Sequence, residues 1–525
     1  MPRVLISDSL SPAAVAVLEE RGVNVDVRIG LSESELAGLI GPYDGLAVRS
    51  ATKVTAQVLD AAQNLKVVGR AGIGVDNIDV AAATQRGVVV MNTPFGNSVT
   101  TAEHAIAMIL ALARQLPAAD RSTRAGRWEK SRFMGTELAG KVLGLIGCGN
   151  IGSIVAERSQ GLRMRVIAYD PYLAPERARD LGVEKVELDQ LLARADVISL
   201  HTPLNESTRN ILDAKALAKT RKGVRIVNCA RGGLLDERAL EEAIRSGHVA
   251  GAALDVFEQE PVRDSPLFGL DEVVVTPHLG ASTAEAQEKV AVHIAEQMAD
   301  YLISGAVVNA INMAPVSAEE APRLQPYMRL AQQLGSFAGQ LTETGLCSAT
   351  ITYSGQVAAL NTRPLTATLL QGLLAPLLDS VNMVNAPIIA RERDIEVTTI
   401  ERDKVEGYQT LIRLDVGTER GARGVAGTLF GEASPRLVEI RGIPIEANLG
   451  PHMLYVRNDD QPGLIGALGR TLGDAGVNIA TFHLGRERPG GDAIALIEID
   501  QPLPEEVLNA ISDLPHVRQV KALSF

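Results

Sequence analysis

A run of six residues has the spacing of a dinucleotide-binding turn. Gly147-Cys-Gly149-Asn-Ile-Gly152 follows a short apolar run and precedes a helical pattern, which is the context that this fingerprint requires. The glycines would permit a tight turn, close approach of the backbone to a pyrophosphate, and contact between helix and strand. The next apolar run ends in Asp170, whose carboxylate would accept hydrogen bonds from a ribose and repel a 2′-phosphate. We therefore predict an NAD site; a glycine-rich turn without a ligand is the alternative.

Other polar residues stand where further apolar runs end. Arg231 precedes two glycines, and its planar guanidinium could bind a carboxylate through two parallel hydrogen bonds. His278 follows the run EVVVTP, and Asp255, Glu258 and Glu260 stand upstream of it. A histidine paired with a glutamate can act as a general acid and base, because the carboxylate orients the ring and stabilises the imidazolium. Each residue alone also has a structural interpretation: a surface arginine, a hydrogen-bonded histidine, a helix cap at Asp255 and a solvated charge at Glu258.

Cations and glycines also gather in the N-terminal part. Arg49 and Ser50 follow one apolar run, and the segment RAGIGVDN, from Arg70 to Asn77, follows the next. Cationic side chains and free backbone N–H groups would suit an anionic substrate. Loop glycines beside salt-bridged arginines are the rival interpretation for each residue taken alone.

The elements that must position these residues alternate between strand and helix. Short apolar runs alternate with helical stretches from Pro2 to about Val99, and a second such set begins at Lys141. This order predicts two doubly wound lobes, each with a parallel sheet covered on both faces. Between them, TTAEHAIAMILALARQLP is apolar nearly all round, so we expect it to be buried between lobes or subunits. Three apolar runs end in Thr-Pro, at Thr93, Thr202 and Thr276, which we place near a shared cleft beyond the strand ends.

The pattern changes after about Met313. The polar, proline-containing segment PVSAEEAPRLQP is interpreted as a linker, and a β-rich region follows it. After a break at Ala447–Pro451, the remaining residues predict the order strand, helix, strand, strand, helix, strand. That order is the ferredoxin-like split motif.

Composition excludes several classes of protein. The chain has 525 residues, 46% hydrophobic and 22% charged, which favours three to four globular domains. Its net charge of −12 argues against nucleic acid as the main partner. The three cysteines, Cys148, Cys229 and Cys347, lack disulfide or metal-ligand spacing. No signal-like N-terminus and no long apolar run is evident, so we expect a cytoplasmic protein without a membrane partner or a metal.

Together, these motifs resemble the D-isomer-specific 2-hydroxyacid dehydrogenases, in chain order from VRSATKVT through GCGNIG and NCARGG to TPHLGAST. The rest resembles the long branch of that family, and VRNDDQPGLIGALGRTLGDAGVNI matches the ACT pattern. The resemblance implies four domains: a substrate-binding domain (1–97 plus 284–312), an NAD-binding Rossmann domain (98–283), an intervening domain (317–450) and an ACT domain (452–525). The intervening domain is assigned by position and length.

The resemblance also implies an activity. It predicts reversible NAD-dependent oxidation of 3-phospho-D-glycerate to 3-phosphohydroxypyruvate, the first step of L-serine biosynthesis, with 2-oxoglutarate reduction as a candidate side activity. Arg231 would bind the substrate carboxylate and C2 oxygen, His278 would take the hydroxyl proton, and Glu260 would pair with His278. Arg132 would reach a neighbouring subunit's cleft, which implies a homo-oligomer, either a dimer or a tetramer.

Three residue sets follow from the same resemblance. The substrate set is Arg49, Ser50, Arg70, Gly72, Asn77 and Arg132. The NAD set is Ile73, Gly147, Gly149, Asn150, Ile151, Gly152, Asp170, Thr202, Cys229, Ala230, Arg231, Asp255, His278, Leu279, Gly280 and Ala281. The effector set, for L-serine, is Asn458, Asp460 and Asn478.

Three alternatives stay open. A hydroxypyruvate or glyoxylate reductase would use the same scaffold without a phosphate clamp or an ACT tail. An NAD(H)-sensing binding protein, such as a corepressor, would not need the set of Arg231, Glu260 and His278. The C-terminal third could also serve only for oligomerisation.

Overall fold

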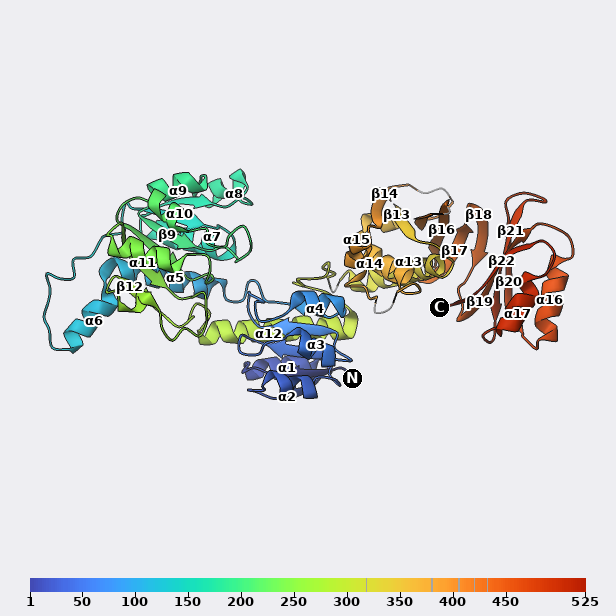
Figure 1. Ribbon diagram of the computed structural model, residues 1–525, viewed down its shortest axis with the longest axis horizontal. Helices are drawn as coiled ribbons and strands as arrows, with labels where there is room; N and C mark the ends of the chain where they lie inside the picture. Colours follow the sequence, from blue (N-terminus) through green and yellow to red (C-terminus); the bar gives the residue numbers. More distant parts are fainter. Residues whose placement is uncertain (318, 379–380, 405–406, 420, 432) are drawn as a thin grey trace. The chain divides into compact units, whose positions relative to one another are not determined.

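The computed structural model describes residues 1–317, 319–378, 381–404, 407–419, 421–431 and 433–525 (Figure 1). The chain forms two compact units. The first comprises residues 1–70, 74–92 and 294–525, and the second comprises residues 71–73 and 93–293. Helix α12 (Ala284–Ser304) contributes residues to both units.

The N-terminal part of the first unit is a parallel five-stranded sheet in the order β2-β1-β3-β4-β5. Its strands are β1 (Arg3–Ile6), β2 (Asn24–Val27), β3 (Gly45–Val48), β4 (Val67–Arg70) and β5 (Val89–Met91). Its helices are α1 (Pro12–Glu20), α2 (Glu33–Leu39), α3 (Ala56–Ala61) and α4 (Val80–Gln85). Every residue of β3 is buried, as expected for a central strand covered on both faces, and the strand order confirms the predicted doubly wound lobe.

The second unit contains a parallel seven-stranded sheet in the order β12-β11-β10-β9-β6-β7-β8. Its strands are β6 (Val142–Ile146), β7 (Arg165–Tyr169), β8 (Glu184–Lys185), β9 (Val197–Leu200), β10 (Val224–Asn228), β11 (Val249–Leu254) and β12 (Val273–Val275). Its helices are α5 (Ser98–Arg114), α6 (Leu116–Arg124), α7 (Asn150–Gly161), α8 (Pro175–Asp180), α9 (Leu188–Arg194), α10 (Ala214–Lys219), α11 (Glu237–Arg245) and the 3₁₀ turn η1 (Pro266–Gly269). The strand order reverses direction between β6 and β9, and ligands of such sheets bind at this switch point.

A mixed six-stranded sheet follows in the first unit, in the order β14-β13-β15-β16-β17-β18. Its strands are β13 (Leu346–Gly355), β14 (Glu396–Arg402), β15 (Thr410–Thr418), β16 (Gly421–Phe430), β17 (Ser434–Ile440) and β18 (Ile443–Ala447). Its helical segments are α13 (Ala321–Gln340), η2 (Gln356–Ala359), α14 (Thr362–Leu374) and α15 (Ala386–Glu392). Helices α13 and α14 cross closely, since a Cβ at Gly335 would lie 2.1 Å from the carbonyl oxygen of Leu369.

The predicted linker PVSAEEAPRLQP is wrong in its second half. Helix α13 begins at Ala321 and includes Pro326. Pro322 stands in the first turn, where its missing N–H removes no helical hydrogen bond. Buried apolar residues such as Leu324 and Leu330 hold this helix in place, so burial outweighs the helix-breaking tendency of Pro326.

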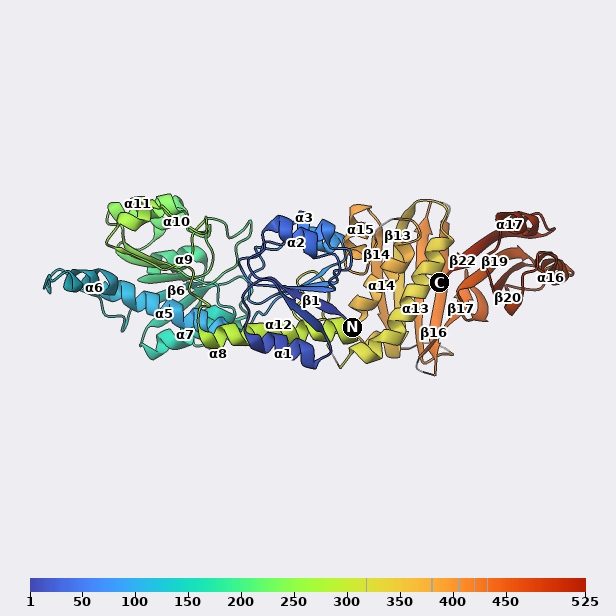
Figure 2. The same ribbon diagram turned by 90° about the horizontal axis from the view of Figure 1, so that it is seen from below.

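The C-terminal region is an antiparallel four-stranded sheet in the order β20-β21-β19-β22 (Figure 2). Its elements are β19 (His452–Asp459), α16 (Leu464–Asp474), β20 (Ile479–Arg486), β21 (Asp492–Ile499), α17 (Glu505–Ser512) and β22 (Val517–Ser524). Leu454, Leu468 and Ile497 form part of its buried core. This arrangement confirms the predicted ferredoxin-like motif. Across the described residues, no helix is both long and apolar enough to span a membrane.

One close contact in the first sheet can be tested by a single methyl group. A Cβ at Gly69 would lie 2.3 Å from the sulfur of Met298 and 2.8 Å from Ile294, both on α12. We expect Gly69→Ala to lower the free energy of unfolding by about 1–3 kcal/mol, the usual range for overpacking. The matched control is Gly38→Ala in α2, whose Cβ would meet no atom of the described part of the chain within 4 Å. Calorimetry should show a melting temperature below that of the wild type for Gly69→Ala but not for Gly38→Ala. A Gly69→Ala variant that melts at the wild-type temperature would contradict this packing.

Candidate active site

The glycine-rich turn lies between β6 and α7 at the switch point of the seven-stranded sheet. Gly147 has φ 93°, and a Cβ there would lie 2.4 Å from the carbonyl oxygen of His201. A Cβ at Gly152 would lie 2.3 Å from the carbonyl oxygen of Gly147, so neither position admits a side chain. Among the described residues, the space around Gly149 is open and no side chain caps the first turn of α7. The N–H groups of this turn, including those of Asn150 and Ile151, therefore face a site that fits an anion.

Asp170 follows β7 beside this turn. Its carboxylate accepts hydrogen bonds from the backbone N–H groups of Cys148, at 2.8 Å, and Tyr172, at 2.9 Å. These contacts fix a half-buried negative charge next to the glycine-rich turn. A pyrophosphate at the helix N-terminus and a ribose at Asp170 would satisfy both features, so the residues present fit a dinucleotide.

The cysteines of this region are not activated. Burial, and then the charge of Asp170, raise the pKa of the Cys148 thiol to about 11. Burial, and then the charge of Asp255, also raise the pKa of Cys229. Both thiols are therefore protonated at neutral pH and are poor nucleophiles. Burial likewise lowers the pKa of His201 to about 4, so this histidine, before Thr202, is neutral.

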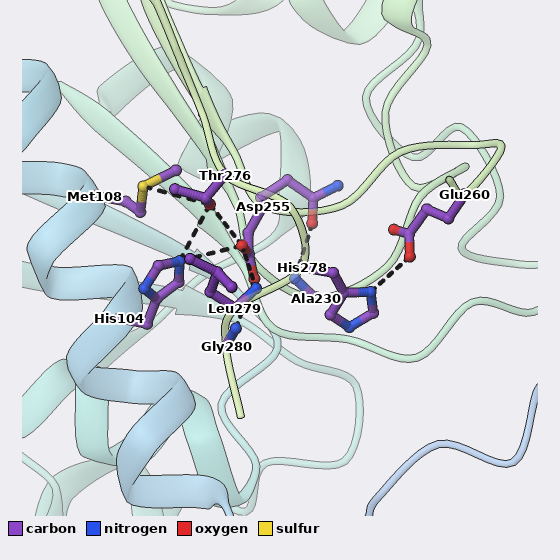
Figure 3. A network of polar contacts seen from close by, with 10 residues as sticks. His104, Met108, Ala230, Asp255, Glu260, Thr276, His278, Leu279 and Gly280 are labelled. Carbon is purple, nitrogen blue, oxygen red and sulfur yellow. Dashed lines mark hydrogen bonds and ion pairs between the residues drawn. The ribbon is translucent and has the colours of Figure 1, made fainter. Parts of the chain in front are cut away.

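Asp255 is the most connected side chain of the site (Figure 3). It is fully buried and accepts hydrogen bonds from the Thr276 hydroxyl at 2.5 Å and the N–H groups of Leu279 at 2.7 Å and Gly280 at 2.9 Å. The Nε2 atom of His104 lies 3.2 Å from the same carboxylate. Burial tends to raise the pKa of Asp255, but the hydrogen bonds outweigh burial and hold it below its ordinary value.

These bonds fix the loop that carries His278. The residue has φ 56°, a left-handed conformation that costs a non-glycine residue roughly 1–2 kcal/mol. Its N–H donates to the carbonyl oxygen of Asp255 at 2.9 Å. Because the following two N–H groups bind the Asp255 carboxylate, three consecutive backbone donors hold the His278 loop in this conformation. Asp255 therefore positions this loop.

His278 and Glu260 form a pair. The Nδ1 atom of His278 lies 2.6 Å from Oε2 of Glu260, and the other carboxylate oxygen accepts the N–H of Phe257 at 3.0 Å. The side chains are 49% and 35% exposed, respectively. Burial tends to raise the pKa of Glu260, but the hydrogen bonds from His278 and Phe257 bring it below its ordinary value. The carboxylate is thus ionised at neutral pH, and the ring keeps Nε2 for proton exchange with a ligand.

Arg231 is held by a turn that Asn228 organises. The Asn228 amide donates to the carbonyl oxygen of Arg231 at 2.8 Å and accepts the N–H of Ala230 at 3.0 Å. A Cβ at Gly232 would lie 1.9 Å from the carbonyl oxygen of Phe257, so only glycine lets the two loops pass this closely. The guanidinium of Arg231 donates to the carbonyl oxygen of Ala230 at 2.6 Å.

The sequence did not indicate that His104 or Asn228 belongs to the site, and it placed Thr276 near the cleft without indicating its partner. His104 and Thr276 contact Asp255, and Asn228 shapes the Arg231 turn. The available signals were a histidine within an otherwise apolar helix and polar residues that end buried strands. Such residues can be assigned to the site only when the strands that lie beside them are known.

The predicted substrate residues divide between the two units. In the first, the Arg49 N–H donates to the buried carboxylate of Asp8 at 2.6 Å, and the Asn77 amide donates to the carbonyl oxygens of Arg49 and Thr52. Arg49 and the exposed Ser50 follow β3, and Arg70 ends β4. Gly72, of the substrate set, and Ile73, of the NAD set, belong to the second unit.

Arg132 also lies in the second unit. Its guanidinium donates to Glu129 at 3.1 Å and to Asp271 at 2.9 Å within the same chain. The predicted contact with a neighbouring subunit stays a prediction.

The predicted effector residues lie on β19, directly after β19, and directly before β20 of the ACT-like fold. Asn458 is buried on β19 and donates to the carbonyl oxygen of Asp459, while its side-chain oxygen has no partner among the residues that the structure describes. Hydrogen bonds from the Gly490 N–H and Arg486 lower the pKa of Asp460. Asn478 donates to Asp500 at 2.8 Å.

Three family descriptions match the chain. Residues 106–280 match the NAD binding domain of the D-isomer specific 2-hydroxyacid dehydrogenases. Residues 323–441 match the D-3-phosphoglycerate dehydrogenase intervening domain, and residues 452–516 match the ACT domain.

Two relatives match the chain over nearly its whole length. The chain is 42% identical to a D-3-phosphoglycerate dehydrogenase of Synechocystis, over 99% of this chain and 94% of that protein. It is 41% identical to a D-3-phosphoglycerate dehydrogenase of Methanocaldococcus jannaschii, over the full length of both. Among solved structures, a glyoxylate reductase from Paecilomyes thermophila matches 59% of this chain and 98% of its own, with a TM-score of 0.56 and 31% identity.

The role of Asp255 as an anchor predicts a loss of stability in Asp255→Asn. An amide cannot accept all the hydrogen bonds that the carboxylate accepts, and a buried donor left unsatisfied costs about 1–3 kcal/mol. The free energy of unfolding at pH 7 should fall by that amount in denaturant unfolding. The control Asp189→Asn removes an exposed carboxylate that pairs with Lys219 and should change stability by less than about 0.5 kcal/mol.

The stabilities of the wild type and of Asp255→Asn should also depend differently on pH. Because the folded pKa of Asp255 lies below its ordinary value of 3.8, the ionised form stabilises the fold above that pH. This stabilisation is lost as the pH falls through the lowered folded pKa. The stability gap between wild type and Asp255→Asn should therefore be complete at neutral pH and shrink below pH 3.8. A gap that does not depend on pH would contradict an ionised Asp255.

Proposed function

Since this chain belongs to the D-3-phosphoglycerate dehydrogenase family of D-isomer-specific 2-hydroxyacid dehydrogenases, we propose that it oxidises 3-phospho-D-glycerate to 3-phosphohydroxypyruvate reversibly. The chain is an NAD-dependent oxidoreductase. In this proposal it catalyses the first step of L-serine biosynthesis in the cytoplasm. The observation that carries the proposal is the His278–Glu260 pair on a loop fixed by Asp255, in the same unit as the dinucleotide turn.

The site residues have distinct roles in the proposed oxidation. NAD, when bound, supplies the acceptor for the C2 hydride. Nε2 of His278 takes the proton of the C2 hydroxyl, while Glu260 holds Nδ1 and stabilises the positive charge that the ring acquires. Arg231 binds the substrate carboxylate and stabilises negative charge on the C2 oxygen. Because the oxidation releases a proton, a higher pH favours the keto acid.

The remaining NAD-set residues are proposed to line the cofactor site. The turn from Gly147 to Gly152 and the N-terminus of α7 suit the pyrophosphate, and Asp170 suits the ribose. Ile73, Thr202, the Cys229–Arg231 turn, Asp255 and residues 278–281 would complete it. These assignments rest on the family pattern and on the position of the second unit's residues after β9, β10 and β11.

The phosphate end of the substrate is assigned to the first unit. Arg49, Ser50 and Arg70 stand at the ends of β3 and β4, and Asn77 fixes the loop after β3. A cationic site of this kind would distinguish a phosphorylated acid from hydroxypyruvate. Because 2-oxoglutarate also has a second anionic end, its reduction is proposed as a side activity.

The chain is also proposed to act as a homo-oligomer, a dimer or tetramer. Trp128 and Met134, which flank Arg132 in the sequence, are 87% and 80% exposed, and exposed apolar side chains of this size favour a protein partner. A second copy covering them would bring Arg132 towards a neighbouring cleft. The predicted division into substrate-binding, NAD-binding, intervening and ACT domains, with the boundaries given above, is retained as part of the proposal.

L-Serine is the proposed effector of the ACT domain. Its ammonium group could donate to the Asp460 carboxylate, and Asn478 could bind its carboxylate, while Asn458 is retained in the proposed set from the family pattern. The intervening domain keeps no assigned ligand.

The substrate assignment is tested by NADH oxidation at 340 nm. We expect a higher kcat/KM for 3-phosphohydroxypyruvate than for hydroxypyruvate, and a reduced rate when L-serine is added. Equal or better use of hydroxypyruvate would favour the reductase alternative, which the likeness to a glyoxylate reductase keeps open. No turnover of either acid would favour an NAD(H) sensor.

The role of His278 is tested by His278→Gln. This change removes the proton acceptor and should lower kcat by about 100-fold or more, the usual contribution of general acid–base catalysis. The dissociation constant for NADH should change little, as measured by fluorescence titration. A near-normal kcat would contradict the assigned role of His278. Glu260→Gln can retain the hydrogen bond to the ring but not the negative charge, so its kcat should lie between those of the wild type and His278→Gln.

Asp170→Ala tests the ribose assignment. Loss of the carboxylate should weaken NAD binding and relax discrimination against NADP, because the charge that repels a 2′-phosphate is removed. The measurement is the ratio of kcat/KM for NADH and NADPH. An unchanged ratio, with unchanged affinity, would show that Asp170 does not contact the ribose.

A further inference from the structure

A cavity lies in the second unit at the amino-terminal ends of three strands of its sheet. It is bordered by residues that precede or begin β6, β9 and β10, whereas the glycine-rich turn follows the end of β6. Its volume is about 250 Å³, many times the roughly 10–15 Å³ that one water molecule requires. None of the residues assigned above to NAD or substrate lines it.

The cavity is cationic. Lys141, Arg221, Lys222 and Arg225 line it together with one carboxylate, Asp196. Asp196 accepts the guanidinium of Arg221 at 2.8 Å and the N–H of Val142 at 2.9 Å, so it compensates one of these cations. Within the described parts of the chain, the other three have no carboxylate within 4.0 Å. This local excess of positive charge occurs in a chain with a net charge of −12.

Among the cations that line the cavity, Arg225 is the one whose position is least explained by contacts within the fold. It is half-buried on β10, an interior strand whose other residues are buried. The register of β10 against β11 shifts between Val224 and Arg225, and such irregularities redirect a side chain. Among the residues that the structure describes, the guanidinium donates one hydrogen bond, to the Thr136 hydroxyl at 2.9 Å, although it carries five N–H donors. The carboxylate that attracts Arg225, that of Asp196, is not within ion-pair distance of it and pairs directly with Arg221 instead. A bound anion would therefore offset the partial desolvation of Arg225.

We propose that this cavity binds a small multivalent oxyanion of the phosphate type, either free phosphate or the phosphate group of a metabolite. Arg225 offers a planar fork that matches two phosphate oxygens, and Lys141 and Lys222 add point charges. The bound anion would stabilise the segment that contains Thr136 and Lys141, which leads into β6. The site is independent of the proposed dehydrogenase activity because it shares no residue with it.

The experiment is a phosphate titration of the full-length protein saturated with NADH. Ionic strength is kept constant with sodium chloride, and binding is followed by thermal unfolding and by calorimetry. We expect a saturable rise in melting temperature with phosphate that chloride does not reproduce. Glycerol 3-phosphate is titrated in parallel: tighter binding of the ester identifies a phosphorylated metabolite, and tighter binding of phosphate identifies the free ion.

Variants locate the bound anion. Lys222→Gln and Arg225→Met should each raise the dissociation constant roughly threefold to tenfold, the effect of losing one charged contact of about 1 kcal/mol. Lys222 is exposed, so Lys222→Gln tests the site even if Arg225→Met fails to fold. The matched control is Arg245→Gln, which removes an exposed cation on α11 outside the cavity and should leave the dissociation constant unchanged.

Two results would overturn the proposal. Phosphate that acts no differently from chloride in the wild type would show that the cavity has no anion preference. Binding that survives Lys222→Gln but is lost in Arg49→Gln would place the anion in the substrate site.

Discussion

The buried carboxylate of Asp255 is the constraint on which the active-site geometry depends. A fully buried negative charge is unfavourable unless donors surround it, and here the donors come from α5 and from the loop after β12. The need to satisfy this charge holds the His278 loop in a left-handed conformation that its sequence alone would not favour. The histidine is therefore placed by a group that is not itself on its loop.

Two carboxylates near His278 do different work because their surroundings differ. Asp255 is fully buried, and its oxygens accept hydrogen bonds from the backbone of the loop. Glu260 is partly exposed, and one of its oxygens contacts the ring itself. In both, burial opposes ionisation and hydrogen bonds restore it, so both are anionic at neutral pH. Asp255 fixes the position of the imidazole, and Glu260 fixes the orientation of the ring. Proton transfer in the proposed oxidation would require both.

Local patterns predicted the parts of the molecule that local chemistry determines. The glycine-rich turn, Asp170 and the order of elements around β19 follow from short stretches of sequence, and the structure has them where the pattern indicated. The half-exposed edge strand β2 was not identified because it lacks a buried apolar run, and α13 was interpreted in part as linker because of its prolines. The contact of His104 with Asp255 could not be predicted, since it depends on how α5 packs beside β11 and β12. The roles of the site residues stay predictions until a ligand is bound.

The most direct test of this account is a crystal structure of the dead-end complex with NADH and 3-phospho-D-glycerate. The account predicts that Nε2 of His278 contacts the C2 hydroxyl while Nδ1 remains on Glu260, and that Asp255 still accepts the N–H groups of Leu279 and Gly280. Arg231 should contact the substrate carboxylate, and the phosphate should lie at Arg49 and Arg70. A C2 hydroxyl directed away from His278, or a His278 loop released from Asp255, would contradict it.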